Sequence, residues 1–406
     1  MTNPPIRQSP WHLPLFRRLW YGTVIISLAN QCERLAAGWL VLVETDSVFL
    51  TAASFAIQKA PASLSAPVAG DLSDRIPRSR LLAATAMFKA IILILLGAVA
   101  YVDTGQIWPV FVLMALSGIG MSFETPSTQG LITDIVPREM AMRAVAMQST
   151  GARAIGALGS LGGGLLIAGF GVPMTLFAGS GIFLIGFLAM ASMRVPAAQQ
   201  QSKRIVGKHI FRDAAQGLVM LLKLNVVRAL LLTAFVVEMF AFAYSALMPS
   251  LARDVLHMAA DGLGTLNFMS GLGAVIGVAV LSAFGDVSRK GMLLIGVTVI
   301  FGCTLISFGL SIYFLLSLVL VMGVGAMAAS FDALQWTLLQ QHVPDDMRGR
   351  SIGGWMFVVG FGWMGQLALG AVAEFIGVQW ALATAGGLVI LTGLAAYALS
   401  PMLRET

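Results

Sequence analysis

Long apolar runs separated by short polar segments dominate this chain. A bilayer has a hydrocarbon core about 30 Å thick, which one helix crosses with roughly 20 apolar residues. Twelve runs reach that length, so the pattern predicts twelve transmembrane helices. They are expected at about 20–43, 48–69, 80–101, 107–131, 141–168 and 173–193, and then at about 227–250, 262–284, 291–310, 313–340, 351–373 and 378–400.

One long polar stretch divides these runs into six and six. We therefore expect an N-terminal six-helix bundle over 1–193, a cytoplasmic linker over 194–226 and a C-terminal six-helix bundle over 227–406. Two short motifs recur in register between the halves: VPREMAMR at 136–143 matches VPDDMRGR at 343–350, and GDLS at 70–73 matches GDVS at 285–288. These matches indicate a duplication. Because six crossings return the chain to the same side, the halves should be parallel repeats related by a pseudo-two-fold axis along the membrane normal.

Composition agrees with an all-α membrane protein. The chain is 58% hydrophobic and 11% charged, whereas soluble domains are about 25% charged. The net charge of +6 does not indicate a nucleic-acid partner, because the Lys and Arg residues lie in short loops. With the N-terminus inside, 20 of the 25 fall on the cytoplasmic side, which predicts that both termini are cytoplasmic.

Residues that carry enzymatic chemistry are sparse. Cys32 and Cys303 lie in separate apolar runs, without the spacing of a disulfide framework or a metal site. The four histidines fall in loops or at the ends of predicted helices, and no zinc-protease motif, nucleophile elbow or phosphate-binding loop is present. We expect neither an enzyme nor a bound cofactor.

The loop after the second predicted helix contains a charged motif, GDLSDRIPRSR at 70–80. It resembles the signature G-x-L-x-D-R-x-G-R-K of the major facilitator superfamily, although Pro and Ser replace the second Gly and the Lys. Gly70 permits a tight turn, and Asp74 can cap the following helix. The resemblance implies a cytoplasmic gate that latches against the other half, formed by Gly70, Asp74, Arg75 and Arg78. The alternative is a charged turn that only fixes topology.

Further segments narrow the resemblance. FRRLW at 16–20 and RLAAGW at 34–39 look like the bacterial efflux branch that includes siderophore and macrolide exporters. RAIGALGSLGGG at 153–164 is similar to the glycine-rich antiporter motif but lacks its Gly-Pro pair. The alternative is that these glycines only allow close contact between helices.

The resemblance implies a monomeric, multi-pass protein of the bacterial cytoplasmic membrane. Its expected function is efflux of an amphipathic small molecule, drug-like or siderophore-like, by alternating access. Its partners are the substrate and the lipid bilayer, and a proton gradient supplies the energy. Multidrug resistance is a typical consequence of such antiport. Proton-coupled import and a non-transporting membrane sensor remain the alternatives.

Ionisable residues inside the predicted helices are candidates for function, because a charge at mid-bilayer costs about 2.5–3.5 kcal/mol on translocon scales. Four acidic and four basic residues are embedded: Glu33, Arg34, Lys59, Lys89, Glu124, Arg153, Glu238 and Asp332. Helical spacing places Arg34 on a polar stripe with Asn30, which predicts a cavity position. Glu33 instead shares a face with alanines, which predicts a helix contact.

The resemblance places the first, fourth, seventh and tenth helices around a central cavity. One embedded charge falls on each of them, whereas Lys89 lies on a helix outside the cavity and receives no role. The residues predicted for substrate binding and proton coupling are Arg34, Glu124, Glu238, Asp332, Arg153, Asn30, Tyr244 and Trp336. A carboxylate in a low dielectric can take a proton from one side and release it to the other, and Glu124 or Asp332 is the predicted carrier. Alternatively the charges form structural pairs, such as Glu124 with Arg153.

Overall fold

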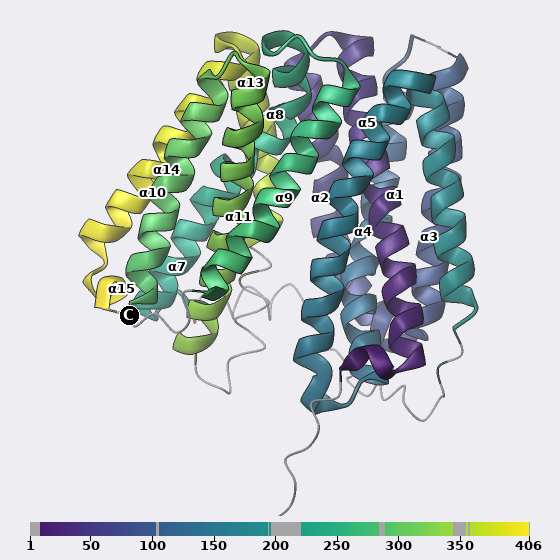
Figure 1. Cartoon of the computed structure of the whole chain (residues 1–406), viewed down its shortest axis with the longest axis horizontal. Helices are drawn as coiled ribbons and strands as arrows, with labels where there is room; N and C mark the ends of the chain where they lie inside the picture. Colours follow the sequence, from purple (N-terminus) through teal and green to yellow (C-terminus); the bar gives the residue numbers. More distant parts are fainter. Residues whose placement is uncertain are drawn as a thin grey trace, which may run out of the picture.

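The computed structural model describes residues 9–102, 105–193, 195, 221–283, 289–343, 355 and 358–405. Every regular element in these ranges is helical. Figure 1 shows long helices in two groups, the first half of the chain in purple to teal and the second half in green to yellow. The first group contains η1 (Pro10–His12), α1 (Pro14–Thr45), α2 (Val48–Arg75), α3 (Arg78–Val102), α4 (Trp108–Ile135) and α5 (Arg138–Ala191).

The second group begins with a composite helix. It consists of α7 (Asn225–Val236), the π-helix η3 (Val237–Ala241), α8 (Tyr244–Ser250) and the π-helix η4 (Leu251–Val255). The remaining elements are α9 (Ala260–Ala283), α10 (Lys290–Leu310), α11 (Phe314–His342), α13 (Gly362–Ile376), α14 (Val378–Leu399) and α15 (Pro401–Glu405).

Nine helices in the described ranges are long and apolar enough to cross a membrane, counting α5 and the composite helix once each. Large apolar side chains also point outward: Leu315 is 77% exposed and Phe375 is 88% exposed. Such surfaces favour aggregation in water, but they are expected against lipid. The fold is therefore that of an all-helical membrane protein.

α5 is 54 residues long and breaks at Gly171, whose φ of 81° lies in the left-handed region. Glycine adopts this conformation without a Cβ penalty, and Pro173 follows as the first turn resumes. This break falls between the fifth and sixth predicted helices.

The motif at 70–80 differs from the sequence expectation. Gly70 lies within α2 instead of in a tight turn, because α2 continues to Arg75 and its end is capped by the Ile76 N–H bonding to the Leu72 carbonyl at 3.0 Å. α3 starts at Arg78, so the connection is only two residues long. The side chain of Asp74 lies outside the described residues, and so do residues 285–288 and 344–350 of the repeated motifs.

The two groups meet where α5 packs on α9 and where α2 packs on α13. At the first crossing, a Cβ added to Gly264 would lie 2.7 Å from the Ser160 carbonyl oxygen and 3.0 Å from Cα of Gly164. At the second, a Cβ on Gly370 would lie 2.4 Å from Cβ of Ala52. Small residues let the helix backbones touch, which is the main source of helix association in lipid. Gly164, in the glycine-rich segment 153–164, therefore permits close contact between α5 and α9.

Replacing Gly264 by Ala should lower the stability of the α5–α9 contact, since the atoms in the way are backbone atoms that cannot rotate aside. We expect a loss of about 1–3 kcal/mol, typical of overpacking. Gly162→Ala is the matched control, because its Cβ would meet nothing within 4 Å and alanine favours the helix by about 1 kcal/mol. Thermal unfolding in detergent measures both, and equal or higher stability of Gly264→Ala would contradict this contact.

Candidate functional site

A cavity of about 440 Å³ lies between the two groups of helices. It is lined by residues of α1, α5, α8, α9 and α11 and by Phe242 next to η3. Its volume lies within the range of small-molecule sites, about 300–1,000 Å³. The predicted residues that line it are Asn30, Arg34, Arg153, Tyr244 and Asp332.

The cavity is polar on both sides. On one side α1 presents Arg34 and α5 presents Arg153, and on the other α11 presents Asp332. The Tyr244 hydroxyl lies 2.8 Å from Oγ of Ser270. Among the described residues, neither arginine has an ion pair or a hydrogen bond from its guanidinium, although Arg153 acts on Asp332 electrostatically. The cavity therefore holds charged groups that remain available to a bound molecule.

Three of the predicted residues lie outside this cavity: Glu124, which belongs to the cluster described below, Glu238 and Trp336. Glu238 is 8% exposed on η3, and its Oε2 lies 3.5 Å from Nζ of Lys59 on α2. The Lys59 ammonium fits because Gly362 has no side chain; a Cβ there would lie 2.5 Å from Nζ. Glu238 therefore forms an ion pair between the two halves and does not line this cavity, and its predicted part in proton coupling stays a prediction.

Trp336 also does not line the cavity. Its ring packs edge-to-face on Trp355, with ring centroids 5.3 Å apart and planes at 71°. Trp336 lies one helical turn beyond Asp332 on α11. Aromatic packing, which favours such perpendicular contacts, accounts for its position.

A second charged cluster is buried inside the first group of helices. Lys89 on α3 is 1% exposed, and its Nζ lies 3.0 Å from Glu33 Oε2 and 3.5 Å from Glu124 Oε1. The same ammonium donates to Asn30 Oδ1 and lies 5.0 Å from the centre of the Phe183 ring. We refer to Asn30, Glu33, Lys89 and Glu124 as the buried network.

Further hydrogen bonds hold the two carboxylates. Glu33 Oε1 accepts from Gln58 Nε2 at 2.8 Å and from the Ser117 hydroxyl, and Glu124 Oε2 accepts from Asn30 Nδ2 at 2.7 Å. The other oxygen of each carboxylate faces Lys89 without a hydrogen bond of good geometry. Two carboxylates and one ammonium carry a net charge of −1 when all are ionised. One added proton would neutralise the network.

The buried network gives Lys89, for which the sequence predicted no role, two carboxylate partners. It also shows that the ion-pair partner of Glu124 is Lys89, whereas the alternative expectation was Arg153. Burial of a lysine in an apolar helix already signals a carboxylate partner, because an unpaired buried charge is strongly unfavourable. Helical spacing did place Glu33 against neighbouring helices, where it is 1% exposed. Which helices those are follows only from the packing.

Glu124 also lines a second cavity, of about 270 Å³, which it shares with Arg153 and Gln148. Its side chain is 17% exposed, whereas Glu33 and Lys89 are each 1% exposed. Of the three ionisable residues in the buried network, Glu124 is thus the one that water reaches. Asn30 connects the network to the central cavity, because it lines that cavity while bonding to both Lys89 and Glu124.

Two residues of the predicted gate, Arg75 and Arg78, form ion pairs with carboxylates of the first half. Arg78 Nη1 is 2.7 Å from Asp134 Oδ1 and 2.9 Å from the Gly130 carbonyl oxygen, so it ties the start of α3 to the end of α4. Arg75 pairs with Asp71 one turn earlier on α2 at 2.8 Å.

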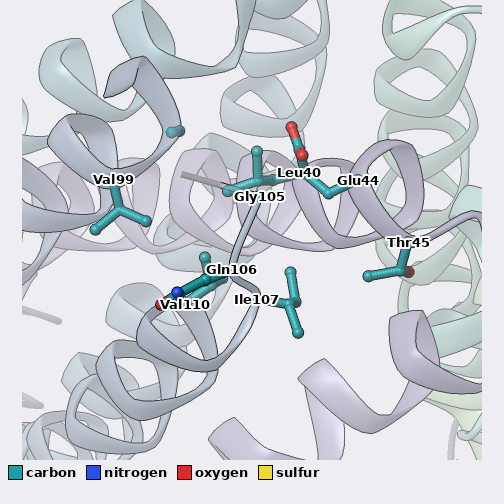
Figure 2. A pocket seen from close by; sticks show the side chains of 9 residues that line it. Leu40, Glu44, Thr45, Val99, Gly105, Gln106, Ile107 and Val110 are labelled. Atoms are coloured by element: carbon teal, nitrogen blue, oxygen red, sulfur yellow. The ribbon is translucent and has the colours of Figure 1, made fainter. Parts of the chain in front are cut away.

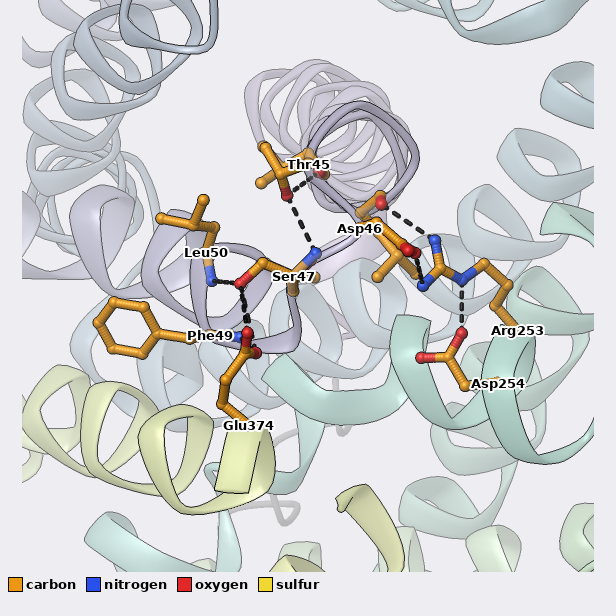
Figure 3. Close-up of polar contacts among 11 residues, drawn as sticks. Thr45, Asp46, Ser47, Phe49, Leu50, Arg253, Asp254 and Glu374 are labelled. Atoms are coloured by element: carbon orange, nitrogen blue, oxygen red, sulfur yellow. Dashed lines mark hydrogen bonds and ion pairs between the residues drawn. The ribbon is translucent and has the colours of Figure 1, made fainter. Parts of the chain in front are cut away.

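A polar cluster joins the two halves at the connection between α1 and α2, and we call it the interhalf clamp: Asp46, Ser47, Arg253 and Glu374 (Figure 3). Arg253 Nη2 lies 2.6 Å from Asp46 Oδ1, and Nη1 donates to the Leu42 carbonyl at 3.0 Å. A cation is favourable at this helix end, where the α1 carbonyls carry partial negative charge. Glu374 on α13 accepts from the Phe49 N–H at 2.8 Å and from the Ser47 hydroxyl at 3.2 Å.

A smaller pocket of about 150 Å³ lies near the clamp, within the first half (Figure 2). The ends of α1 and α3 and the residues before α4 surround it, and Glu44 is the one charged residue among its described lining. It lies to one side of the interface between the halves, so the central cavity is the better candidate for a transport site.

Comparison with known proteins identifies the class. A family model described as transmembrane secretion effector matches residues 7–405, and the chain belongs to this family, an efflux branch of the major facilitator superfamily. It is a multi-pass membrane protein of a bacterial transporter family.

Relatives and solved structures agree with that assignment. The chain is 26% identical to the enterobactin exporter EntS of Shigella boydii, over 84% of this chain and 81% of the relative. It is 27% identical to the multidrug resistance protein MdtG of Proteus mirabilis, over 85% of each. Among structures, a peptide transporter of the POT type aligns with a TM-score of 0.77 at 14% identity, covering 98% and 97% of the two chains. A bacterial homologue of the lysosomal transporter Spinster, in an inward-facing and unoccupied conformation, aligns at 0.74 with 13% identity, covering 96% and 98%.

Replacing Lys89 by Met should destabilise the fold strongly, because it leaves Glu33 and Glu124 without their cation. Breaking a buried pair in this way costs about 3–5 kcal/mol. Glu33→Gln added to Lys89→Met should recover part of that loss, since it removes one of the two uncompensated charges. Thermal unfolding in detergent is the measurement. The exposed Lys223→Met is the control, with a change within about 0.5 kcal/mol, and a similarly small change at Lys89 would contradict the network.

Proposed function

We propose that this protein is a secondary active transporter that exports an amphipathic small molecule, drug-like or siderophore-like, in exchange for protons. The observation that carries the proposal is the pairing of a central cavity between two helix groups with a buried, net-negative network that contacts it through Asn30. The protein acts by alternating access, as a monomer and without a cofactor, and the proton gradient supplies the energy.

The proposed architecture has twelve transmembrane helices in two six-helix bundles. To the nine helices counted above, α1 with 32 residues and α2 with 28 residues add two, and the break at Gly171 divides α5 into two crossings. The N-terminal bundle is 1–193, the linker 194–226 and the C-terminal bundle 227–406, related by a pseudo-two-fold axis along the membrane normal.

The start of α1 and the C-terminus lie at the same end of the molecule (Figure 1). We place this end on the cytoplasmic face of the bacterial inner membrane, so the interhalf clamp faces outward. Epitope tags at either terminus should then be protected from protease added outside intact cells, and cleavage of either tag would contradict this orientation.

Export is supported by relatives named as an enterobactin exporter and as multidrug resistance proteins. Import remains the second candidate, because solved structures with this fold include peptide and nucleoside transporters. The two directions differ in their response to an ionophore. Collapse of the proton gradient should raise cellular accumulation of an exported molecule and lower that of an imported one.

Glu124 is the proposed proton carrier. Its carboxylate is reached from the second cavity, and protonation there would bring the buried network from a charge of −1 to neutrality. Glu33 would then be the one ionised carboxylate of the network facing Lys89, and the charge-assisted hydrogen bond from Asn30 Nδ2 to Glu124 would weaken while the bond from Lys89 to Asn30 stays. Asp332, which lines the central cavity without an ion pair in the described ranges, is the alternative carrier.

Glu124→Gln should reduce proton-driven efflux to a tenth or less, because the amide cannot exchange a proton. Fluorescent dye accumulation in cells, with and without an ionophore, measures the effect. Glu44→Gln is the control, since Glu44 is an exposed carboxylate that lines neither the central cavity nor the second cavity. Asp332→Asn tests the alternative carrier. Unchanged ionophore-sensitive efflux in both the Glu124 and the Asp332 variants would eliminate proton transfer at these residues.

Opening of the outer end requires the interhalf clamp to separate. Arg253→Ala should therefore increase the ratio of outward-open to closed protein by about fivefold. This corresponds to loss of about 1 kcal/mol of stabilisation of the closed state, which is typical of a partly exposed ion pair. Spin labels at Gln106 and Tyr313, in a background without Cys32 and Cys303, report the distance across that end. Arg17→Ala is the control. A distance distribution unchanged by Arg253→Ala would show that the clamp does not hold the closed state.

A further inference from the structure

The embedded cations are of two kinds. Lys59 and Lys89 each have a carboxylate partner, Glu238 for the first and Glu33 and Glu124 for the second. Arg34 and Arg153 both line the central cavity, and among the described residues neither has an ion pair or a hydrogen bond from its guanidinium. An arginine remains charged at any physiological pH, so it cannot lower the energy of its burial by losing a proton.

The cavity is open in this structure, and water can solvate both guanidinium groups. Arg34 is half-buried, and Arg153 is exposed. Alternating access requires an occluded step in which the cavity is closed at both ends and most of this water is lost. At that step a charge without a partner becomes strongly unfavourable.

Within the described lining, Asp332 is the one carboxylate opposite two arginines. Its charge balances one of them, so the charged residues that line the cavity sum to +1, and the adjacent buried network is neutral in itself once Glu124 carries its proton. A neutral or cationic cargo would leave that charge unpaired during occlusion. An anionic cargo would compensate it.

We infer that the substrate is an amphipathic organic anion whose carboxylate, sulfonate, phosphate or phenolate group is held by Arg34 and Arg153. Its apolar part would lie against Phe242, Met248 and Ala328, which line the same cavity. Guanidinium groups suit such anions because they donate paired hydrogen bonds in a fixed plane. This inference rests on the proposed transport function and specifies its substrate class.

An anionic cargo also has an electrical consequence. The inside of a bacterial cell is negative, so outward movement of one negative charge is favoured by about 50-fold at about 100 mV. Exchange for inward-moving protons adds to the same driving force. Export is therefore the direction that the membrane potential assists for this class of substrate.

The binding test uses the full-length protein in nanodiscs with two fluorescent probes that differ in one charge, dansylglycine and its methyl ester. We expect dansylglycine to bind at least tenfold more tightly than the ester. Arg34→Gln and Arg153→Gln should each remove most of that preference, whereas Arg34→Lys, which keeps the charge, should retain much of it. Arg17→Gln, on the exposed start of α1, is the matched control. No binding of dansylglycine, equal affinity for both probes, or a preference unaffected by both glutamine variants would overturn the inference.

A transport arm separates this inference from the proposed function. In proteoliposomes with a potassium diffusion potential, dansylglycine should move toward the positive side, and reversing the potential should reverse its movement. Binding of the anion without any transport would refute the transporter and leave the anion preference standing. Protein-dependent transport of the ester, measured above its passive leak in protein-free liposomes, at the rate of dansylglycine and unchanged in Arg34→Gln, would support the transporter and refute the anionic substrate class.

Discussion

The unfavourable energy of a charge in hydrocarbon governs this structure more than any other constraint. A lysine or glutamate inside a helix bundle needs a partner of opposite charge, hydrogen bonds or access to water. Lys89 satisfies this requirement with two carboxylates and Asn30, and Lys59 satisfies it with Glu238. The positions of α1, α3 and α4 are thereby tied together by polar contacts in an otherwise apolar interior. The same rule makes Arg34 and Arg153 of the central cavity informative, because neither has an ion pair within the part of the chain that the structure describes.

These charges fall into places with different access. Glu33 and Lys89 are enclosed, Glu124 borders the second cavity, and Arg34 and Asp332 border the central cavity. Asn30 and Arg153 belong to both environments: the first bonds to the buried network and lines the central cavity, and the second lines both cavities. A change of charge at Glu124 is therefore adjacent to the proposed substrate site without being part of it. Such adjacency is what coupling between proton and substrate requires in physical terms.

The interface between the halves combines close backbone contact with a few polar links. Glycines at the α5–α9 crossing bring backbones together, and Lys59–Glu238 and the interhalf clamp add ion pairs near the middle and at one end. Backbone contacts of this kind tolerate a change of crossing angle better than interlocked large side chains do, because no large side chain has to leave a gap between residues of the other helix. The polar links at the clamp are partly exposed and individually weak. The interface is thus suited to rocking of one half against the other.

The sequence alone determined which segments are helical and that lipid surrounds them, because both depend on the length and polarity of local runs. Its repeated motifs predicted a division into halves, and helical spacing identified Arg34 and Asn30 as a polar stripe. It did not determine that Lys89 meets Glu33 and Glu124, that Glu238 turns to Lys59, or that Trp336 packs on Trp355. Each of these contacts joins different helices, and the face that a helix presents to a neighbour depends on its rotation and on the crossing of backbones. Those quantities are fixed by the packing of the whole bundle, and so only the tertiary structure decided which embedded charges are paired and which remain available to a substrate.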